Sequence, residues 1–244
     1  QGLPMAACIL VALLVGTACG AINGLLLVRF PELNSTIVTL GTQILYRGLA
    51  YMLLEDISLK GYAKQLSPLA WNRVFGLPVI LVTFILMTLV FAFTIHRTQF
   101  GRHMFAMGTN KTAAYFSGIH TDRIKLLVFT LSGLCAAFAG LFLSAKLGSV
   151  RASIAQGYEM EVIAMAILGG ASPSGGRGNV GGVVLGMFTI GLIRYGAGLV
   201  NVSSDTLKII IGGLLIVVCA APNLKQVLAD ASETFRGRKQ LGIQ

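Results

Sequence analysis

The chain has 244 residues, of which 55% are hydrophobic and only 11% charged, and its mean hydropathy is +0.79. An average soluble domain carries about 25% charged residues, so this composition excludes a soluble globular domain, and its hydrophobicity excludes a disordered chain. The net charge of +10 does not indicate nucleic-acid binding, because the Lys and Arg residues stand in loops between apolar runs, where they set membrane topology and contact lipid headgroups.

Apolar stretches predict about seven membrane segments, at 1–28, 33–54, 74–95, 126–145, 156–169, 178–193 and 209–224. A helix needs about 20 residues to cross about 30 Å of hydrocarbon, and the first, third and fourth segments reach that length unaided. The segment 156–169 is short, which fits a half-helix or re-entrant element, although the charge distribution favours a crossing. The runs do not alternate, which excludes a membrane barrel. The sequence therefore predicts an all-α polytopic transmembrane helix bundle.

The basic residues indicate which side of the membrane each loop faces. Placing the loop 98–125 in the cytoplasm, with the tail 225–244 on the same side, puts most of the 19 Lys and Arg residues inside. Those left outside are Lys60, Lys64, Arg73, Lys146 and Arg151. About seven crossings then place the N-terminus outside. A start outside, without a basic signal region, suggests that N-terminal helices are missing from the sequence.

The loop 55–77 is the longest one on the predicted outer side. Trp71 and Tyr62 in this loop suit a membrane interface. Two interpretations stay open here: a docking surface for an external partner, and a solvated connector.

Small residues recur four positions apart in three of the segments. Gly16, Gly20 and Gly24 share one helix face, and the same spacing relates Gly182 to Gly186 and Ala136 to Gly140. Such faces let helix backbones approach closely in lipid. We expect packing within the chain, with a seam between two copies as the alternative.

Polar groups within the apolar segments are costly and usually face the bundle interior or water. For Arg47, Asp205 and Lys208 the simplest interpretation is that the side chain reaches for the interface. Glu161 is harder to dismiss, and it is expected to neutralise Arg151 or Arg194. Possible members of a translocation path are Asn23, Asn34, Thr39, Gln43 and Glu161.

Catalytic and metal-binding patterns are missing from the sequence. The four cysteines lie inside apolar runs without C-x-x-C spacing, and the three histidines show no metal-ligand spacing. Gly176, Gly178 and Gly181 match G-x-G-x-x-G, but membrane segments flank them instead of a βαβ unit, so a tight turn between packed helices is expected instead of a nucleotide site. We expect neither an enzyme nor a bound metal or cofactor.

The loop 98–125 is too long and too patterned for a simple connector. Asn110 can cap a short helix that begins at Lys111, and Gly118 can end it in a left-handed conformation. The expected product is a short helix at the cytoplasmic surface with small residues on one face. That shape suits insertion into a groove on another protein.

Three stretches carry a resemblance to a known family. They are LNSTIVTLGTQILYRGLAYM at 33–52, GRHMFAMGTNKTAAYFSGIHTDRIKLLVFTLSGLCAAFAGLF from Gly101, and GYEMEVIAMAILGGASPSGGRGNVGGVVLG from Gly157. Together they resemble the permease subunits of bacterial ribose-type sugar ABC importers, whose members carry ribose, xylose, other pentoses, rhamnose or the autoinducer-2 signalling sugar. The resemblance runs through essentially the whole chain, although the family has about ten helices.

The resemblance implies a single permease domain over 1–244 that forms the sugar path in the bacterial cytoplasmic (inner) membrane. It implies three protein partners: a cytoplasmic subunit that binds ATP, a periplasmic or extracellular sugar-binding protein, and a second permease subunit, identical or different. The loop 98–125 would be the coupling loop that docks on the ATPase. The contact positions carried over from the family are Gly108, Asn110, Ala113, Ala114, Ser117 and Gly118.

Two other kinds of transporter remain as alternatives. A permease of the branched-chain amino-acid type shares the general architecture, and the three stretches fit the sugar group better. An ion-coupled secondary transporter would need ionisable groups at mid-membrane, for which Glu161 is the strongest candidate.

Overall fold

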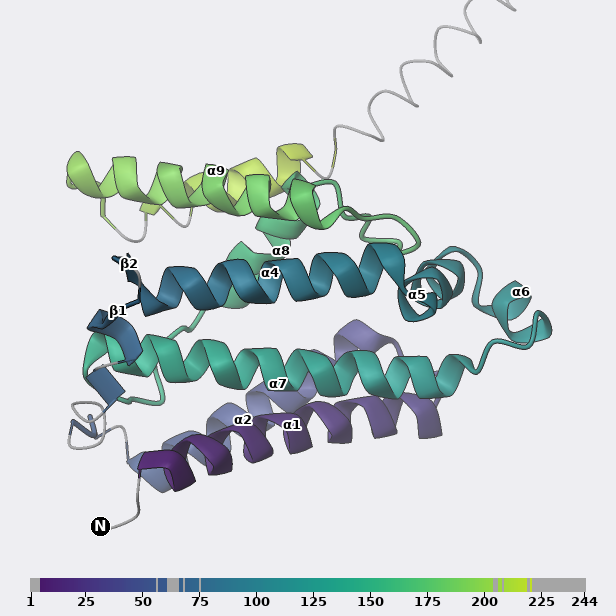
Figure 1. Cartoon of the computed structure of the whole chain (residues 1–244), viewed down its shortest axis with the longest axis horizontal. Helices are drawn as coiled ribbons and strands as arrows, with labels where there is room; N and C mark the ends of the chain where they lie inside the picture. The colour runs from purple at the N-terminus through teal and green to yellow at the C-terminus, as the bar shows by residue number, and fades with distance from the viewer. Residues whose placement is uncertain are drawn as a thin grey trace, which may run out of the picture. The chain divides into compact units, whose positions relative to one another are not determined.

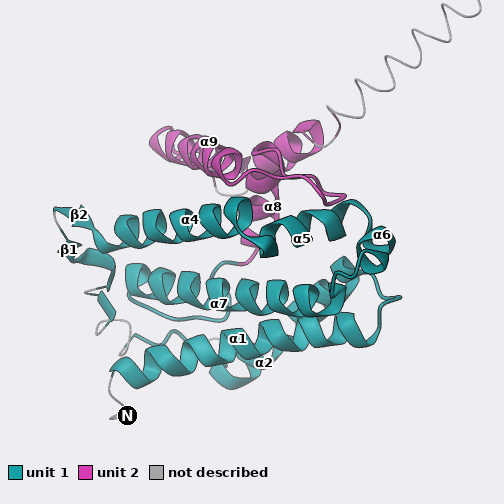
Figure 2. Ribbon diagram, turned by 45° about the vertical axis from the view of Figure 1, so that its right-hand side comes forward, with its two compact units in different colours: residues 1–155 teal, residues 156–244 magenta. Residues whose placement is uncertain are grey.

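The computed structural model describes residues 5–55, 57–60, 66–67, 69–74, 76–203, 206–207, 209–218 and 220. The predicted tail 225–244 and Tyr62, Lys64, Asp205, Lys208 and Cys219 lie outside these residues. The chain divides into two compact units, residues 1–155 and residues 156–244, which are coloured separately in Figure 2. Each unit is described by itself.

Among the described residues, five helices are long and apolar enough to cross a membrane. They are α1 (Met5–Arg29), α2 (Ser35–Leu54), α4 (Val79–Arg97), α7 (Thr121–Leu147) and α9 (Val180–Leu199). Their outward side chains are mostly large and apolar: Ile44 of α2, for example, is 73% exposed and Leu185 of α9 is 69% exposed, as expected of surfaces that face lipid. The all-α polytopic fold is confirmed.

One of the predicted segments is shorter than a full crossing in the structure. Helix α8 (Tyr158–Leu168) has 11 residues, and at 1.5 Å per residue it spans about 16 Å, roughly half of the hydrocarbon layer. Within the predicted segment 209–224, the described part includes the apolar helix Ile209–Val218. The count of seven crossings stays a prediction.

A glycine seam joins α1 to α7 in the first unit, where Figure 1 shows the two helices side by side. A Cβ at Gly16 would lie 2.5 Å from the Cβ of Ala137, and one at Gly20 would lie 2.9 Å from the Cα of Gly133. Only glycine permits this approach, because real Cβ atoms do not come so close. The seam confirms that the Gly16–Gly20–Gly24 face packs within the chain.

A short turn joins α4 to α5 (Gln99–Thr109), a helix that the sequence interpretation did not foresee. The Thr98 side chain accepts a hydrogen bond from the Gly101 amide at 3.5 Å, which caps the first turn of α5. Gly101 is buried, and a Cβ there would overlap the Ile95 carbonyl. The close approach fixes how α5 leaves the end of α4.

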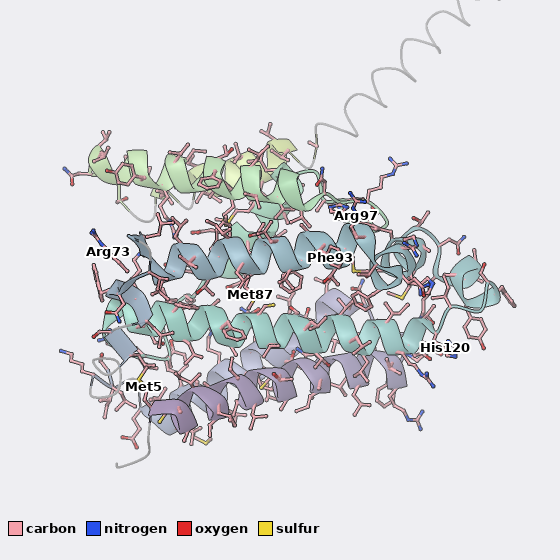
Figure 3. All side chains as sticks on the ribbon, viewed as in Figure 1. Met5, Arg73, Met87, Phe93, Arg97 and His120 are labelled. Atoms are coloured by element: carbon pink, nitrogen blue, oxygen red, sulfur yellow. The ribbon has the colours of Figure 1, made fainter. Side chains whose placement is uncertain are left out.

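The two ends of the first unit differ in structure. Arg97 and His120 lie at one end in Figure 3, with α5 and α6 (Lys111–Phe116), and Met5 and Arg73 lie at the other. The Lys125 ammonium donates a hydrogen bond to the Leu27 carbonyl at 3.3 Å, so the end of α1 that carries Arg29 meets the start of α7. The loop 98–125 and Arg29 thus share one end, as the predicted topology requires.

At the opposite end, the predicted outer loop folds back onto the helices. Leu66 and Ala70 are buried with Ala145 of α7, and Met5 of α1 packs against them. Beside them, β1 (Arg73–Val74) pairs antiparallel with β2 (Leu77–Pro78), two residues each. Trp71 is 72% exposed.

The second unit is built on a hairpin of α8 and α9. A Cβ at Gly182 would overlap the Gly169 carbonyl, and one at Gly186 would lie 2.9 Å from the Gly169 amide nitrogen. Gly175 and Gly176 in the connecting loop have φ of +86° and +73°, which confirms the predicted tight turn with left-handed glycines. Gly140 of the third small-residue pair has open space above it.

Candidate functional site

A polar pocket of about 410 Å³ lies between the two N-terminal helices of the first unit. Its volume falls in the range of small-molecule sites. Asn23 comes from α1, and Ala152 comes from the connector after α7. The rest of the lining lies on one side of α2: Thr39, Thr42, Gln43, Tyr46, Arg47 and Ala50. Polar side chains thus gather at one place in otherwise apolar spans.

Hydrogen bonds hold the walls of this pocket in place. The Tyr46 hydroxyl donates to the Cys19 carbonyl of α1 at 3.4 Å, and the Arg47 Nη1 donates to the Ala152 carbonyl at 3.4 Å. The hydroxyls of Thr39 and Thr42 donate back to carbonyls of their own helix, which leaves their oxygen lone pairs to accept. The α2 surface therefore offers acceptors as well as the donors of Arg47.

Asn23 has an unusual position among these groups. Its Oδ1 is buried and has no hydrogen-bond partner among the described residues. Buried polar atoms are almost always paired, and an unpaired one costs about 1–3 kcal/mol. A ligand hydroxyl that donated to this oxygen would recover that cost, once the Asn23 side chain turned to expose the oxygen to the pocket.

The structure brings together three of the five predicted path residues, Asn23, Thr39 and Gln43. Asn34 is placed differently: it is the N-cap of α2, and its side chain accepts from the Thr36 amide at 2.9 Å. Asn34 therefore begins the helix and is not among the residues that line this pocket; its place in a translocation path stays a prediction. A local capping signal, Asn before Ser35, was present in the sequence.

Glu161, the fifth path candidate, lies in the second unit. It is 8% exposed, and its Oε1 accepts a hydrogen bond from Arg194 Nη2 at 2.5 Å. Of the two partners that the sequence left open, Arg194 is the one that pairs. The Arg194 guanidinium also lies 5.0 Å from the ring centroid of Tyr158, within the range of a cation–π contact.

The short helix α6 has the caps that the sequence predicts. The Asn110 side chain accepts from the Ala113 amide at 3.0 Å at its start. At its end Gly118 has a φ of +80°, the Gly118 amide donates to Tyr115, and the Ile119 amide donates to Ala114. This pair of bonds is a Schellman motif, which satisfies the last carbonyls. Both ends of the helix are confirmed.

The exposure of α6 changes the expected contact surface. Ala114 is 5% exposed, because it faces back into the chain, so it is not available to a partner in this structure. Ala113, Ser117, Gly118 and Asn110 are exposed, and Gly108 is half-buried. The sequence interpretation did not single out Tyr115 and Phe116, which are 66% and 83% exposed and contact each other edge to face. Aromatic residues in a cytoplasmic loop were the signal available.

A pocket of about 390 Å³ adjoins this aromatic pair. Val28 and Pro31, from the end of α1 and the turn after it, line the pocket with Tyr115 and Phe116. Lys111 and Asp122 also line it. Apolar side chains with charged ones beside them match the apolar core and polar rim of a protein interface.

Residues 1–219 match the family described as branched-chain amino acid transport system, permease component. The chain is 35% identical over 221 residues to the D-allose transport system permease protein AlsC of Escherichia coli, covering 91% of this chain and 68% of that protein. It is 34% identical to the autoinducer 2 import system permease protein LsrD of Photorhabdus temperata, covering 88% of this chain and 66% of the relative. For the ribose import permease protein RbsC of Bacillus subtilis the identity is 32%, with coverages of 84% and 63%.

The chain thus spans about two thirds of the length of these relatives. No solved structure matches it.

Proposed function

The chain belongs to this family of transport-system permease components, and from that premise we propose that it forms the translocation path of an ATP-driven monosaccharide importer. It is a multi-pass membrane protein of the bacterial inner membrane, and its relatives are transport subunits, not enzymes. The relatives described above are permeases for D-allose, ribose or autoinducer 2, which supports a sugar over the amino acid in the family description.

The polar pocket of the first unit is the observation that carries this proposal. A monosaccharide is a neutral ring of hydroxyls, each of which donates and accepts. The pocket supplies donors at Arg47, acceptors at Thr39 and Thr42, and the unpaired Oδ1 of Asn23. A polar surface of this kind within apolar spans has a cost in lipid unless water or a substrate meets it.

The exposed end of the first unit supports a cytoplasmic partner. We assign ATP to that separate subunit, and α6 to the surface that docks on it through Tyr115 and Phe116. The close backbone contacts at Gly101 and in the glycine seam pack this surface tightly against the spans, so that a movement of α6 would move the spans with it. ATP binding and hydrolysis on the partner would then shift the packed helices between two states, provided that the nucleotide-bound partner favours one of these states.

Two further partners belong to the proposal. An external sugar-binding protein would dock on the end that carries Trp71, where the solvated-connector alternative remains open. A second permease subunit, identical or different, would complete the path.

Sugar uptake in the source bacterium tests the proposal. A strain that lacks the gene is complemented with the wild type, and uptake of radiolabelled D-ribose and D-allose is measured. We expect Asn23→Leu to raise the KM of uptake about tenfold, because one hydroxyl loses its acceptor. Asn34→Ser is the matched control, since Ser keeps the cap of α2.

The energy source and the substrate of uptake distinguish the ATP-driven sugar importer from the two alternative transporters. Uptake that stops on ATP depletion and survives a protonophore supports the importer. Uptake that survives ATP depletion and collapses with the ion gradient would establish the secondary transporter, and uptake of leucine in place of either sugar would establish the amino-acid permease.

A further inference from the structure

The second unit contains a polar cleft of about 400 Å³ that the pocket of the first unit does not include. Tyr158 and Glu161 of α8 form one wall, and Arg194 and Gly198 of α9 form the other. Leu207 adds an apolar edge. The cleft is therefore built from the first turns of α8 and the last turns of α9, which are their outer ends in the predicted topology.

Two contacts hold the Arg194 side chain in the cleft. Its Nη2 donates to Glu161 Oε1, and its Cζ lies over the Tyr158 ring, 5.0 Å from the ring centroid. The guanidinium has five N–H donors, and Glu161 is the acceptor described for it. With its side chain 43% exposed, Arg194 still presents donors to the cleft, next to a carboxylate that is 11% exposed.

Glycine makes room beside this pair. A Cβ at Gly198 would meet no atom within 4 Å, and the same holds at Gly157, at the start of α8. Other glycines of the hairpin are needed for close helix contact, as Gly182 and Gly186 show, but Gly198 is not. Its missing side chain leaves open space that the cleft occupies.

We propose that the Tyr158–Glu161–Arg194 cleft is a binding subsite for a neutral monosaccharide on its way through the chain. The inference rests on the proposed function and adds a second contact point, in the second unit. A sugar hydroxyl accepts from the free guanidinium N–H groups and donates to the carboxylate, so it binds without separating the ion pair. Because the pair has no net charge, the cleft favours an uncharged polyol over an anion or a cation.

An amino acid would bind differently. Its carboxylate could accept from the free N–H groups of Arg194 only beside the like-charged Glu161 carboxylate, and its ammonium would meet the positive charge of Arg194. A neutral sugar hydroxyl meets neither repulsion. Leucine is therefore the informative competitor.

Closing the cleft tests the proposal sterically. In the complemented strain, Gly198→Leu should raise the KM for D-ribose or D-allose at least tenfold, because the new side chain fills the space beside Arg194. Gly191→Leu is the matched control: it lies on the same helix, it also has open space above it, and it lies outside the cleft. Equal KM values for the two variants would overturn the inference.

Variants of the Glu161–Arg194 pair test whether its role is only to hold α8 against α9. Arg194→Lys should raise the KM about tenfold while the purified protein keeps its melting temperature, since Lys keeps the charge but loses the planar donors. The double variant Glu161→Arg with Arg194→Glu keeps an ion pair between the helices, so it should also keep the melting temperature, but it should not restore the KM. If the swap restored the KM, the pair would serve only to hold α8 against α9 and the subsite would be refuted.

The wild-type measurement separates this inference from its premise. If the wild type takes up both sugars and the cleft variants leave the KM unchanged, the subsite fails and the proposed function stands. If the wild type takes up leucine and none of ribose, xylose, rhamnose and D-allose, both fail.

Discussion

The glycine seam and the helix α6 lie in the same unit and are built on opposite principles. At the seam, Gly16 and Gly20 of α1 meet Gly133 of α7 so closely that no side chain fits between the backbones. At α6, the chain places Phe116 in the open with 83% of its surface exposed. One region is fully packed inside the chain, and the other leaves an apolar surface exposed, which we propose a partner covers. The difference teaches where the unit is rigid and where it is available for docking.

Filling the seam should have the largest effect. Gly20→Leu puts a side chain where the Phe129 carbonyl and the Gly133 backbone already lie, and backbone cannot move aside cheaply. Overpacking costs about 1–3 kcal/mol where side chains can yield, so we expect at least about 3 kcal/mol here and little folded protein.

The measurement is the yield of monodisperse protein in detergent and its melting temperature. Gly140→Leu, on α7 with open space above it, is the control and should melt like the wild type. Equal yields for the two variants would show that close packing at the seam does not determine the stability of the fold.

Adding a methyl group at Gly101 should weaken the coupling of movement between α6 and the helices of the glycine seam. Gly101→Ala puts a Cβ 2.8 Å from the Ile95 Cα, and the α4–α5 turn must open to admit it. The expected cost is about 2 kcal/mol. The melting temperature should fall by a few degrees, and stimulation of the partner ATPase by sugar-loaded binding protein should fall further than stability alone explains. Stimulation that tracks the melting temperature would mean that the turn is only structural.

Removing the exposed aromatic ring should affect docking and leave the fold intact. Burying a Phe side chain contributes about 1.5–3 kcal/mol, so Phe116→Ala should weaken binding of the ATP-binding subunit at least about tenfold. Co-purification of the two subunits over a salt and detergent series reports this, with unchanged melting of the permease. Thr109→Ala, at the exposed end of α5 and outside the pocket beside Phe116, is the control. Equal retention of the partner by both variants would contradict the docking role.

The smallest effect is expected at the cap of α6. Asn110→Ala leaves the Ala113 amide without its acceptor, at a cost of about 1 kcal/mol. Because α6 has six residues, this loss should fray it and lower ATPase stimulation a few fold. Asn110→Ser should rescue the stimulation, whereas a side chain that acted only by contact with the partner would not be replaced by Ser.

How much of these two regions can be predicted from the sequence depends on how far apart along the chain the interacting residues lie. Asn110 and Gly118 act on amides a few residues away, so both ends of α6 could be predicted from them. The small-residue face of α1 was evident, but its partner Gly133 lies more than a hundred positions along the chain and only the fold reveals it. The same holds for Ala114, because whether it faces in or out depends on how α6 packs.

Two residues of the candidate sites illustrate the same limit. Asn34 was assigned to the path because it is polar beside a span, although its neighbours also suit a cap, which is its place in the structure. Glu161 required a cation, but the sequence alone could not choose between Arg151 and Arg194, since the choice depends on how α8 and α9 pair.

The side of the membrane on which α6 lies is the most direct test of the account. Single cysteines are placed at Phe116 and at Lys60, which lie at opposite ends of the first unit and are exposed, and the unmodified protein reports background labelling. A membrane-impermeant maleimide should label the cysteine at 60 in intact spheroplasts and the cysteine at 116 only in inverted vesicles. Labelling of position 116 from outside intact spheroplasts would place α6 away from any ATPase and would contradict the account.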